Sequence, residues 1–160
     1  MWAMGKPSRI TNYSLDSVKV SGFYALNGTS VIERIPDTKA SSICVMLEAV
    51  RAANGDRPVV MILDNASNHH SSVVTERATE LGITLAFLPP YSPKLNPIEQ
   101  IWKCVKREVS QHFLVDLDEL FWLIRDVFLE KARTGKYAEA WKRRFLTKKT
   151  RNRIAAYRVS

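Results

Sequence analysis

Two spacings of apolar residues alternate along this chain, one of two residues and one of about 3.6, and together they predict a mixed α/β fold. Residues 18–26 and 30–35 have the β-branched and aromatic content of strands, and the Asn27-Gly28 turn between them predicts a hairpin. Continuous apolar runs at residues 58–63 and 83–88 are typical of strands buried on both faces of a parallel sheet. Helical spacing predicts helices at residues 38–54, 71–81, 97–112 and 116–133, with a weaker last helix in the C-terminal tail.

The segment between the last predicted strand and the next helix has a distinctive composition. Residues 89–96 contain three prolines, which predicts a stiff, extended loop with few backbone donors. Asn96 is a good N-cap and Pro97 suits the first helical position, so a helix is expected to begin there. The loop should therefore present the first turn of this helix to the ends of the strands.

Length and composition fit one globular domain. The chain has 160 residues, of which 46% are hydrophobic, so we expect a core domain over residues 1–135 and a basic tail, residues 136–160, that belongs to the same domain. No stretch reaches the roughly 20 apolar residues that a membrane span needs, and the N-terminus lacks the order of a signal peptide. We expect a soluble, cytoplasmic protein that is associated with the nucleoid when it is bound to DNA.

The formal net charge of +8 is concentrated near the C-terminus. Residues 1–98 carry a balance of +1 and residues 99–160 a balance of +7; within the latter, residues 142–158 hold eight basic residues and no acidic one. A positive surface of this kind favours a polyanionic partner. The alternative is a solvated tail that only aids solubility.

Two carboxylates carry the candidate chemistry. Asp64 closes the buried strand predicted at residues 58–63, and Glu99 falls in the first turn of the helix after the proline-rich loop. Carboxylates placed in this way can converge on hydrated Mg²⁺ and leave coordination sites for a substrate phosphate. Simpler readings remain for both residues, because Asp64 could begin an Asx turn and Glu99 could close a capping box with Asn96.

Around these carboxylates the sequence carries a recognisable set of motifs. Leu63-Asp64-Asn65 is followed by His69, then by Leu-Pro-Pro-Tyr-Ser-Pro at residues 88–93 and Leu-Asn-Pro-Ile-Glu at residues 95–99. With Trp102 one turn further on, this arrangement resembles the catalytic domain of the insertion-sequence 630 and Tc1/mariner transposases, which are integrase-like proteins with an RNase H fold.

The resemblance implies an RNase H-like mixed sheet flanked by helices and a DDE-type endonuclease that cleaves DNA and transfers strands in transposition. It makes Asp64 the second and Glu99 the third acidic residue of a catalytic triad that binds Mg²⁺ or Mn²⁺. Asn65 and His69 match family positions beside the site, where they would orient other groups or contact DNA. Phosphate contacts are expected from exposed basic residues: Lys94, Lys103, Lys106, Arg107, Lys142, Arg143 and Arg144. The alternative for the helix after Glu99 is a solvated surface with a Glu99–Lys103 pair.

The chain also departs from the family pattern. The family's first catalytic Asp lies on the first, central strand, upstream of a segment that resembles Trp2 to Pro7, and no residue here matches it. We therefore expect a sheet that lacks its central strand, with unpaired neighbours, and a chain that is inactive alone. An upstream segment or reading frame would have to supply the missing part, and we expect a homodimer in the DNA complex.

Two further readings stay open. The chain could be a degenerate transposase remnant that acts as a basic DNA-binding module without catalysis. It could also be a structural or interaction protein in which Asp64 and Glu99 are only a turn residue and a cap.

Overall fold

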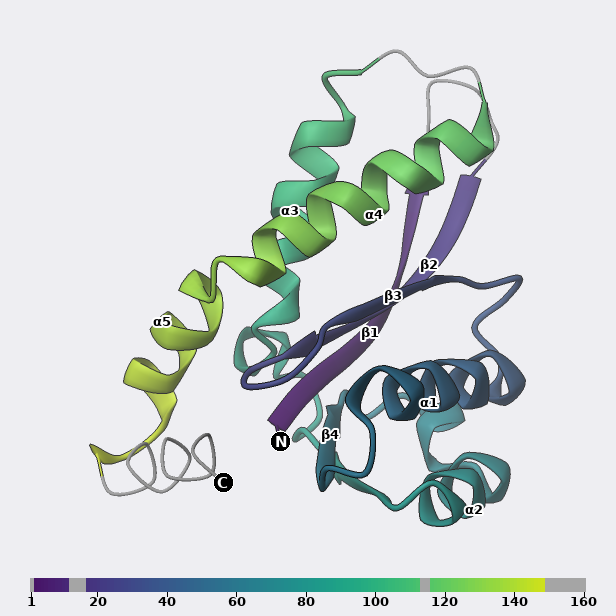
Figure 1. The fold of residues 1–160 in the computed structure, drawn as a ribbon, viewed down its shortest axis with the longest axis vertical. Helices are drawn as coiled ribbons and strands as arrows, with labels where there is room; N and C mark the ends of the chain where they lie inside the picture. The colour runs from purple at the N-terminus through teal and green to yellow at the C-terminus, as the bar shows by residue number, and fades with distance from the viewer. Residues whose placement is uncertain (1, 12–16, 113–115, 149–160) are drawn as a thin grey trace.

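The fold is built on one five-stranded sheet with helices on both faces, as the computed structural model in Figure 1 shows. The structure describes residues 2–11, 17–112 and 116–148, and of residues 2–11 only the backbone. The strand order is β3-β2-β1-β4-β5. The strands are β1 (Trp2–Thr11), β2 (Ser17–Ala25), β3 (Val31–Arg34), β4 (Val59–Leu63) and β5 (Ile83–Phe87).

The centre of the sheet corrects one prediction from the sequence. We expected the central strand to be missing, but β1 lies there, antiparallel to β2 and parallel to β4. Ladder hydrogen bonds come from the backbone, so a segment without apolar alternation can still satisfy the neighbouring strands. The expected unpaired ladder groups are therefore absent from the described β1–β2 and β1–β4 pairs. The rest of the predicted pairing is confirmed: β2 and β3 form an antiparallel hairpin, and β4 and β5 are parallel.

One face of the sheet is covered by α1 (Ala40–Asn54) and α2 (Ser72–Glu80). The helical spacing predicted from the sequence places Met46, Leu47 and Val50 of α1 inside, and none of them is more than 3% exposed. They pack with alternate residues of the strands. The strand residues of this core are Phe23, Ala25, Val31, Val59, Met61, Leu63 and Ile83.

The other face is covered by α3 (Ile98–Val109), α4 (Leu117–Arg133) and α5 (Lys136–Phe145) (Figure 1). Trp102 and Phe128 cross over β2 at Gly22, where an added Cβ would lie 2.7 Å from the indole and 2.9 Å from the phenyl ring. Glycine is needed there because the two rings occupy the space of a side chain. Tyr24, two residues along the same strand face, accepts a hydrogen bond from the Ala138 amide at 2.8 Å and so ties α5 to the sheet.

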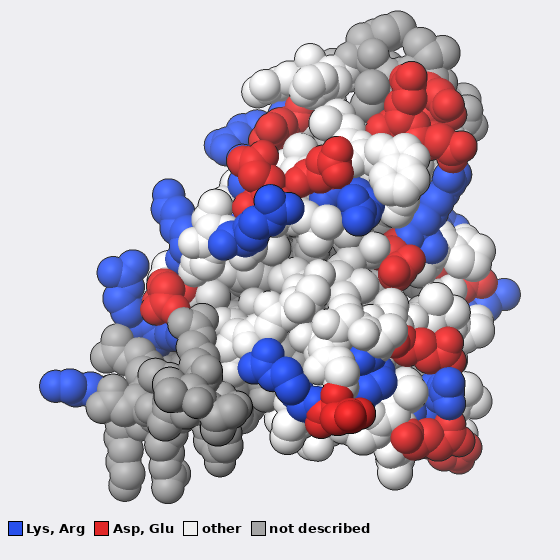
Figure 2. All heavy atoms as spheres, viewed as in Figure 1, with Lys and Arg blue, Asp and Glu red and all other residues white. Residues whose placement is uncertain are grey.

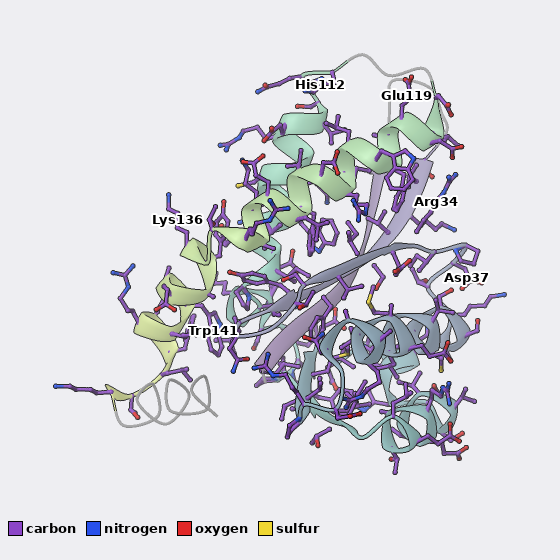
Figure 3. All side chains as sticks on the ribbon, in the orientation of Figure 1. Arg34, Asp37, His112, Glu119, Lys136 and Trp141 are labelled. Atoms are coloured by element: carbon purple, nitrogen blue, oxygen red, sulfur yellow. The ribbon has the colours of Figure 1, made fainter. Side chains whose placement is uncertain are left out.

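Short connections complete the chain. Two 3-10 turns that the sequence did not predict, η1 (Ser67–His70) and η2 (Pro93–Leu95), follow β4 and β5. Figure 3 shows Trp141 on the side of α5 that faces the body of the molecule, where its indole N–H donates to the Leu95 carbonyl at 2.7 Å. Among the described residues, no helix is long and apolar enough to cross a membrane. The end of the predicted basic tail, residues 149–160, lies outside the described residues.

Candidate active site

A groove of about 650 Å³ lies at the carboxyl end of β4, where that strand, the loop after β5 and the start of α3 meet. Asp64 and Glu99 both line this groove, although thirty-four residues separate them in the sequence. Asn65, Asn96 and the proline-rich loop form the rest of its wall. The structure therefore brings together the two carboxylates that the sequence singled out.

The Asp64 carboxylate is held in place by the turn that follows it. Its Oδ1 accepts a hydrogen bond from the Ala66 amide at 3.3 Å, which is the predicted Asx turn. The same Oδ1 lies 2.8 Å from His69 Nδ1, and that nitrogen is also 3.1 Å from the Asp64 carbonyl. Since both partners are acceptors, Nδ1 carries the proton and donates. About a third of the Asp64 side chain, 35%, remains exposed on the groove side.

His69 is a buried partner of Asp64, and its side chain is only 4% exposed. Burial lowers the pKa of His69, but the hydrogen bonds and negative charge of Asp64 raise it, and the net direction is upward. Of the two roles predicted for His69, a direct DNA contact is wrong in this structure because the ring is buried. The orienting role fits the geometry.

Asn65 is exposed and lines the groove, as a DNA-contacting residue should. Its Oδ1 lies 2.6 Å from Nε2 of His70, and the His70 ring stacks on Phe87 of β5 with centroids 4.0 Å apart. His70 was not among the residues predicted for the site. The η1 turn directs the two adjacent histidines to different partners: His69 contacts Asp64, and His70 contacts Asn65.

Glu99 lies in the first turn of α3 and lines the groove. The Asn96 N–H donates to the Pro93 carbonyl at 3.0 Å. Asn96 does cap the helix, because its Oδ1 accepts from the Ile98 amide at 3.3 Å.

Behind Glu99, α3 separates an apolar face from a basic face as predicted. Ile98, Ile101, Trp102, Val105 and Val109 are all buried. Lys103, Lys106 and Arg107 are exposed, and Lys94 is exposed on the η2 turn. These four side chains are available for the phosphate contacts predicted for them.

The basic residues of α5 divide differently from the prediction. Lys142 is 6% exposed, and its ammonium donates to the Leu26 carbonyl at 3.3 Å and to Glu139 at 3.0 Å. A phosphate contact from Lys142 is therefore wrong; its place one turn after the buried Ala138 is the sequence signal that could have shown this. Arg143 and Arg144 are exposed, and Figure 2 shows basic side chains gathered along the edge formed by α5.

The groove offers oxygen ligands of the kind that Mg²⁺ and Mn²⁺ prefer, two carboxylates and nearby amide oxygens. Within the described parts of the chain, no group of three or more His, Cys, Asp and Glu side chains could hold a metal ion. The central strand β1 contains no Asp or Glu. Its Gly5 pairs with Leu63, so the next residues along the two strands are Lys6 and Asp64. Among the residues that the structure describes, the donor set therefore fits a hydrated ion held by two carboxylates, without a third.

A second cavity, of about 770 Å³, lies at the β2–β3 turn beside the junction of α4 and α5. Arg57, Arg125 and Arg133 line it, and Asp64 and Glu99 do not. This cavity holds no pair of carboxylates, so the candidate chemistry belongs to the groove at the end of β4.

Solved structures share this fold. The catalytic domain of Mos1 mariner transposase superposes with a TM-score of 0.65 at 15% identity, over 88% of this chain and 78% of that chain. The catalytic core of BIV integrase gives 0.60 at 13% identity, over 84% and 97%. A simian T-cell lymphotropic virus intasome gives 0.64 at 16% identity, over 79% and 46%. The fold is thus RNase H-like, of the class seen in integrase and transposase catalytic domains.

Sequence comparison gives the family. A model of the DDE superfamily endonucleases matches residues 4–121, and the chain belongs to that family. An uncharacterized protein of Sinorhizobium fredii, y4pE/y4sA, is 34% identical over 76 residues, which are 47% of this chain and 54% of that protein. The chain thus spans about half the length of this relative.

Proposed function

We propose that this chain is the catalytic part of a transposase of the insertion-sequence 630 and Tc1/mariner kind, which cuts and joins DNA phosphodiester bonds. The observation that carries the proposal is the convergence of Asp64 and Glu99 on one groove. Membership of the DDE superfamily endonucleases supports the reaction class. The proposed substrate is DNA, which a homodimer would bind. A divalent ion is supported by a structure of the Mos1 transposase catalytic domain with Mn, which shares this fold.

Each residue of the groove has a role in this scheme. His69 fixes the orientation of the Asp64 carboxylate, while α3 fixes the position of Glu99. A divalent ion bound between them would activate water or a DNA 3′-hydroxyl and stabilise the leaving oxygen. Exposed basic residues of α3 then contact the flanking phosphates, which orients the scissile bond in the groove.

Binding of Mn²⁺ tests the proposal directly. Paramagnetic broadening of backbone amide signals should be strongest around Asp64 and Glu99, and the variants Asp64→Asn and Glu99→Gln should each weaken binding severalfold. Glu48→Gln is the matched control, because Glu48 is a surface carboxylate paired with Arg77 away from the groove. Unchanged affinity in either groove variant would remove that residue from the site, and broadening elsewhere would contradict the proposal.

A second candidate function is DNA binding without catalysis. It is favoured by the composition of β1, which contains no acidic residue beside Asp64. Under this reading the chain binds DNA and does not nick it, even when a third carboxylate is supplied. Lys6→Asp places a carboxylate next to Asp64 in the β1–β4 register, and Arg9→Asp is its control further along β1.

These variants separate the two candidates. Tighter Mn²⁺ binding and metal-dependent plasmid nicking in Lys6→Asp, but not in Arg9→Asp, would support an active site that lacks one ligand. Nicking by the unaltered chain would contradict the non-catalytic reading.

A further inference from the structure

Asn96, a residue in the wall of the groove, has a side-chain hydrogen-bond donor without a partner in the structure. Asn96 is 3% exposed, and its Nδ2 is buried without a hydrogen-bond partner in the structure. The same residue lines the groove together with Asp64 and Glu99. Buried amide groups are nearly always paired, so an orphaned donor at this position calls for an acceptor from outside the chain.

The helix cap decides which end of the amide is bound within the chain and which end is left without a partner. Oδ1 of Asn96 accepts from the Ile98 amide at 3.3 Å, and a flipped side chain would place two donors against each other there. Pro97 follows directly, and the Asn96 backbone N–H is bound to the Pro93 carbonyl at 3.0 Å, which restrains the residue further. The donor therefore has a fixed direction before any ligand arrives.

We infer that Nδ2 of Asn96 donates to a non-bridging oxygen of the DNA phosphate that lies between Asp64 and Glu99. This inference rests on the proposed function and adds a substrate-binding residue to it. A phosphate oxygen is a strong acceptor, and a neutral amide can bind it without competing for the divalent ion that the carboxylates hold. Asn96 thereby couples the start of α3 to the position of the substrate.

The variant Asn96→Ser tests this role, because serine keeps an oxygen for the helix cap and removes the amide donors. Asp116→Ser is the matched control, since Asp116 caps α4 through the Asp118 amide, at the opposite end of the α3–α4 pair. Binding of a short DNA duplex should weaken about tenfold in Asn96→Ser and stay unchanged in Asp116→Ser. In the unaltered chain, the side-chain amide signal of Asn96 should shift when DNA is added.

The outcomes keep this inference apart from the proposed function. If Asp64→Asn and Glu99→Gln weaken Mn²⁺ binding while Asn96→Ser leaves DNA affinity unchanged, only the inference fails. If neither carboxylate variant has an effect, the proposed function fails first. The side-chain amide signal of Asn96 can be measured without any substitution. If this signal does not shift when the unaltered chain binds DNA, the inference is overturned even if the serine variant does not fold.

A different observation concerns Tyr91, at the tip of the proline-rich loop. Its side chain is fully exposed, at 103% of the reference area, and its φ of 57° is the one positive φ of a non-glycine residue in the described chain. Such a conformation is strained for a bulky residue and marks functional loops. Tyr91 also lines the groove that holds Asp64.

We propose that the Tyr91 ring stacks on an unpaired nucleobase beside the scissile phosphate. Aromatic rings on stiff backbones bind bases in this way because every base offers a flat face. The prolines at positions 89, 90 and 93 hold the ring out in water, so little flexibility is lost on binding. Unlike the Asn96 contact, this one selects DNA with a frayed or single-stranded end.

Two substitutions isolate the ring. Tyr91→Asn removes it and tolerates positive φ, while Tyr91→Phe keeps it and serves as the control. Affinity for a duplex with an unpaired end should fall about tenfold in Tyr91→Asn, stay unchanged in Tyr91→Phe, and be the same in all three proteins for a blunt duplex. Equal binding of both duplexes by Tyr91→Asn and the unaltered chain would overturn the proposal.

Discussion

The two faces of the sheet each position one of the two carboxylates. Asp64 follows β4, whose Val59, Met61 and Leu63 are buried under α1 and α2. Glu99 begins α3, whose Ile101 and Trp102 are buried on the opposite face together with α4. The groove at the end of β4 is where the two layers meet, and neither layer alone contains the site.

Because each carboxylate depends on a different face of the sheet, a packing defect should affect the two carboxylates unequally. A loss of packing on one face should displace one carboxylate while the other keeps its surroundings, since packed interiors transmit strain locally. The two faces also differ in composition: the α3–α4–α5 face carries the large rings of Trp102, Phe128 and Tyr24, and the α1–α2 face is mainly aliphatic. The rings make the Glu99 side the more sensitive to truncation.

The largest effect is expected from Trp102→Ala. Trp102 is 2% exposed and packs on Phe128 with ring centroids 5.0 Å apart, so its removal should cost about 3–5 kcal/mol of unfolding free energy. Urea unfolding measures the loss. At low temperature, where the variant is still folded, Mn²⁺ should broaden the backbone amide signals near Glu99 less than those near Asp64. Equal broadening at both residues would contradict the idea that each face of the sheet positions one carboxylate.

The counterpart on the other face is Leu47→Ala. Leu47 is fully buried in the α1–α2 core, and its truncation should cost about 2–5 kcal/mol. Here Mn²⁺ should broaden the amide signals near Asp64 less than those near Glu99, the reverse of the result expected for Trp102→Ala. The pair of variants thus tests the comparison in both directions, and Val45→Ala, at an exposed position of α1, is the control.

Much of this arrangement could be read from the sequence. The 3.6-residue spacing located both buried helix faces, and the apolar run before Asp64 placed it correctly at a strand end. Two features could not be read. β1 has no apolar alternation and contains Pro7, so only its pairing with distant strands makes it a strand. The helical spacing from Ala138 could have indicated that Lys142 is buried, but its partner, the Leu26 carbonyl 116 positions away, is not shown by any local pattern.

Alkaline pH should act on one face through Tyr24. Burial raises the pKa of Tyr24 to about 12, from 10.0, although the hydrogen bond from the Ala138 amide lowers it. Because the unfolded phenol ionises first, this group leaves stability unchanged below about pH 10 and lowers it between about pH 10 and 12, by about 2–3 kcal/mol in total. Unfolding free energies at a series of pH values measure the loss.

Tyr24→Phe is the variant that checks this assignment. It loses the acceptor for Ala138 and should be less stable at neutral pH, but its stability should fall less steeply above pH 10. The same slope in both proteins would show that other groups cause the alkaline loss.

The smallest effects are expected from the basic residues of α5, some of which lie on its outer surface and one on its buried side. Arg143 and Arg144 are exposed, so replacing both by Ala should leave unfolding unchanged and flatten the salt dependence of DNA binding by about 0.9 per lost phosphate contact. Lys142→Met should do the reverse: it removes the donor to the Leu26 carbonyl, lowers stability by about 1–3 kcal/mol and leaves the salt slope unchanged. A flatter slope in Lys142→Met would return this residue to the DNA-binding surface. Unchanged slopes in the double variant would instead make Arg143 and Arg144 a solvated surface, and the predicted phosphate contacts of α3 and of Lys94 would remain.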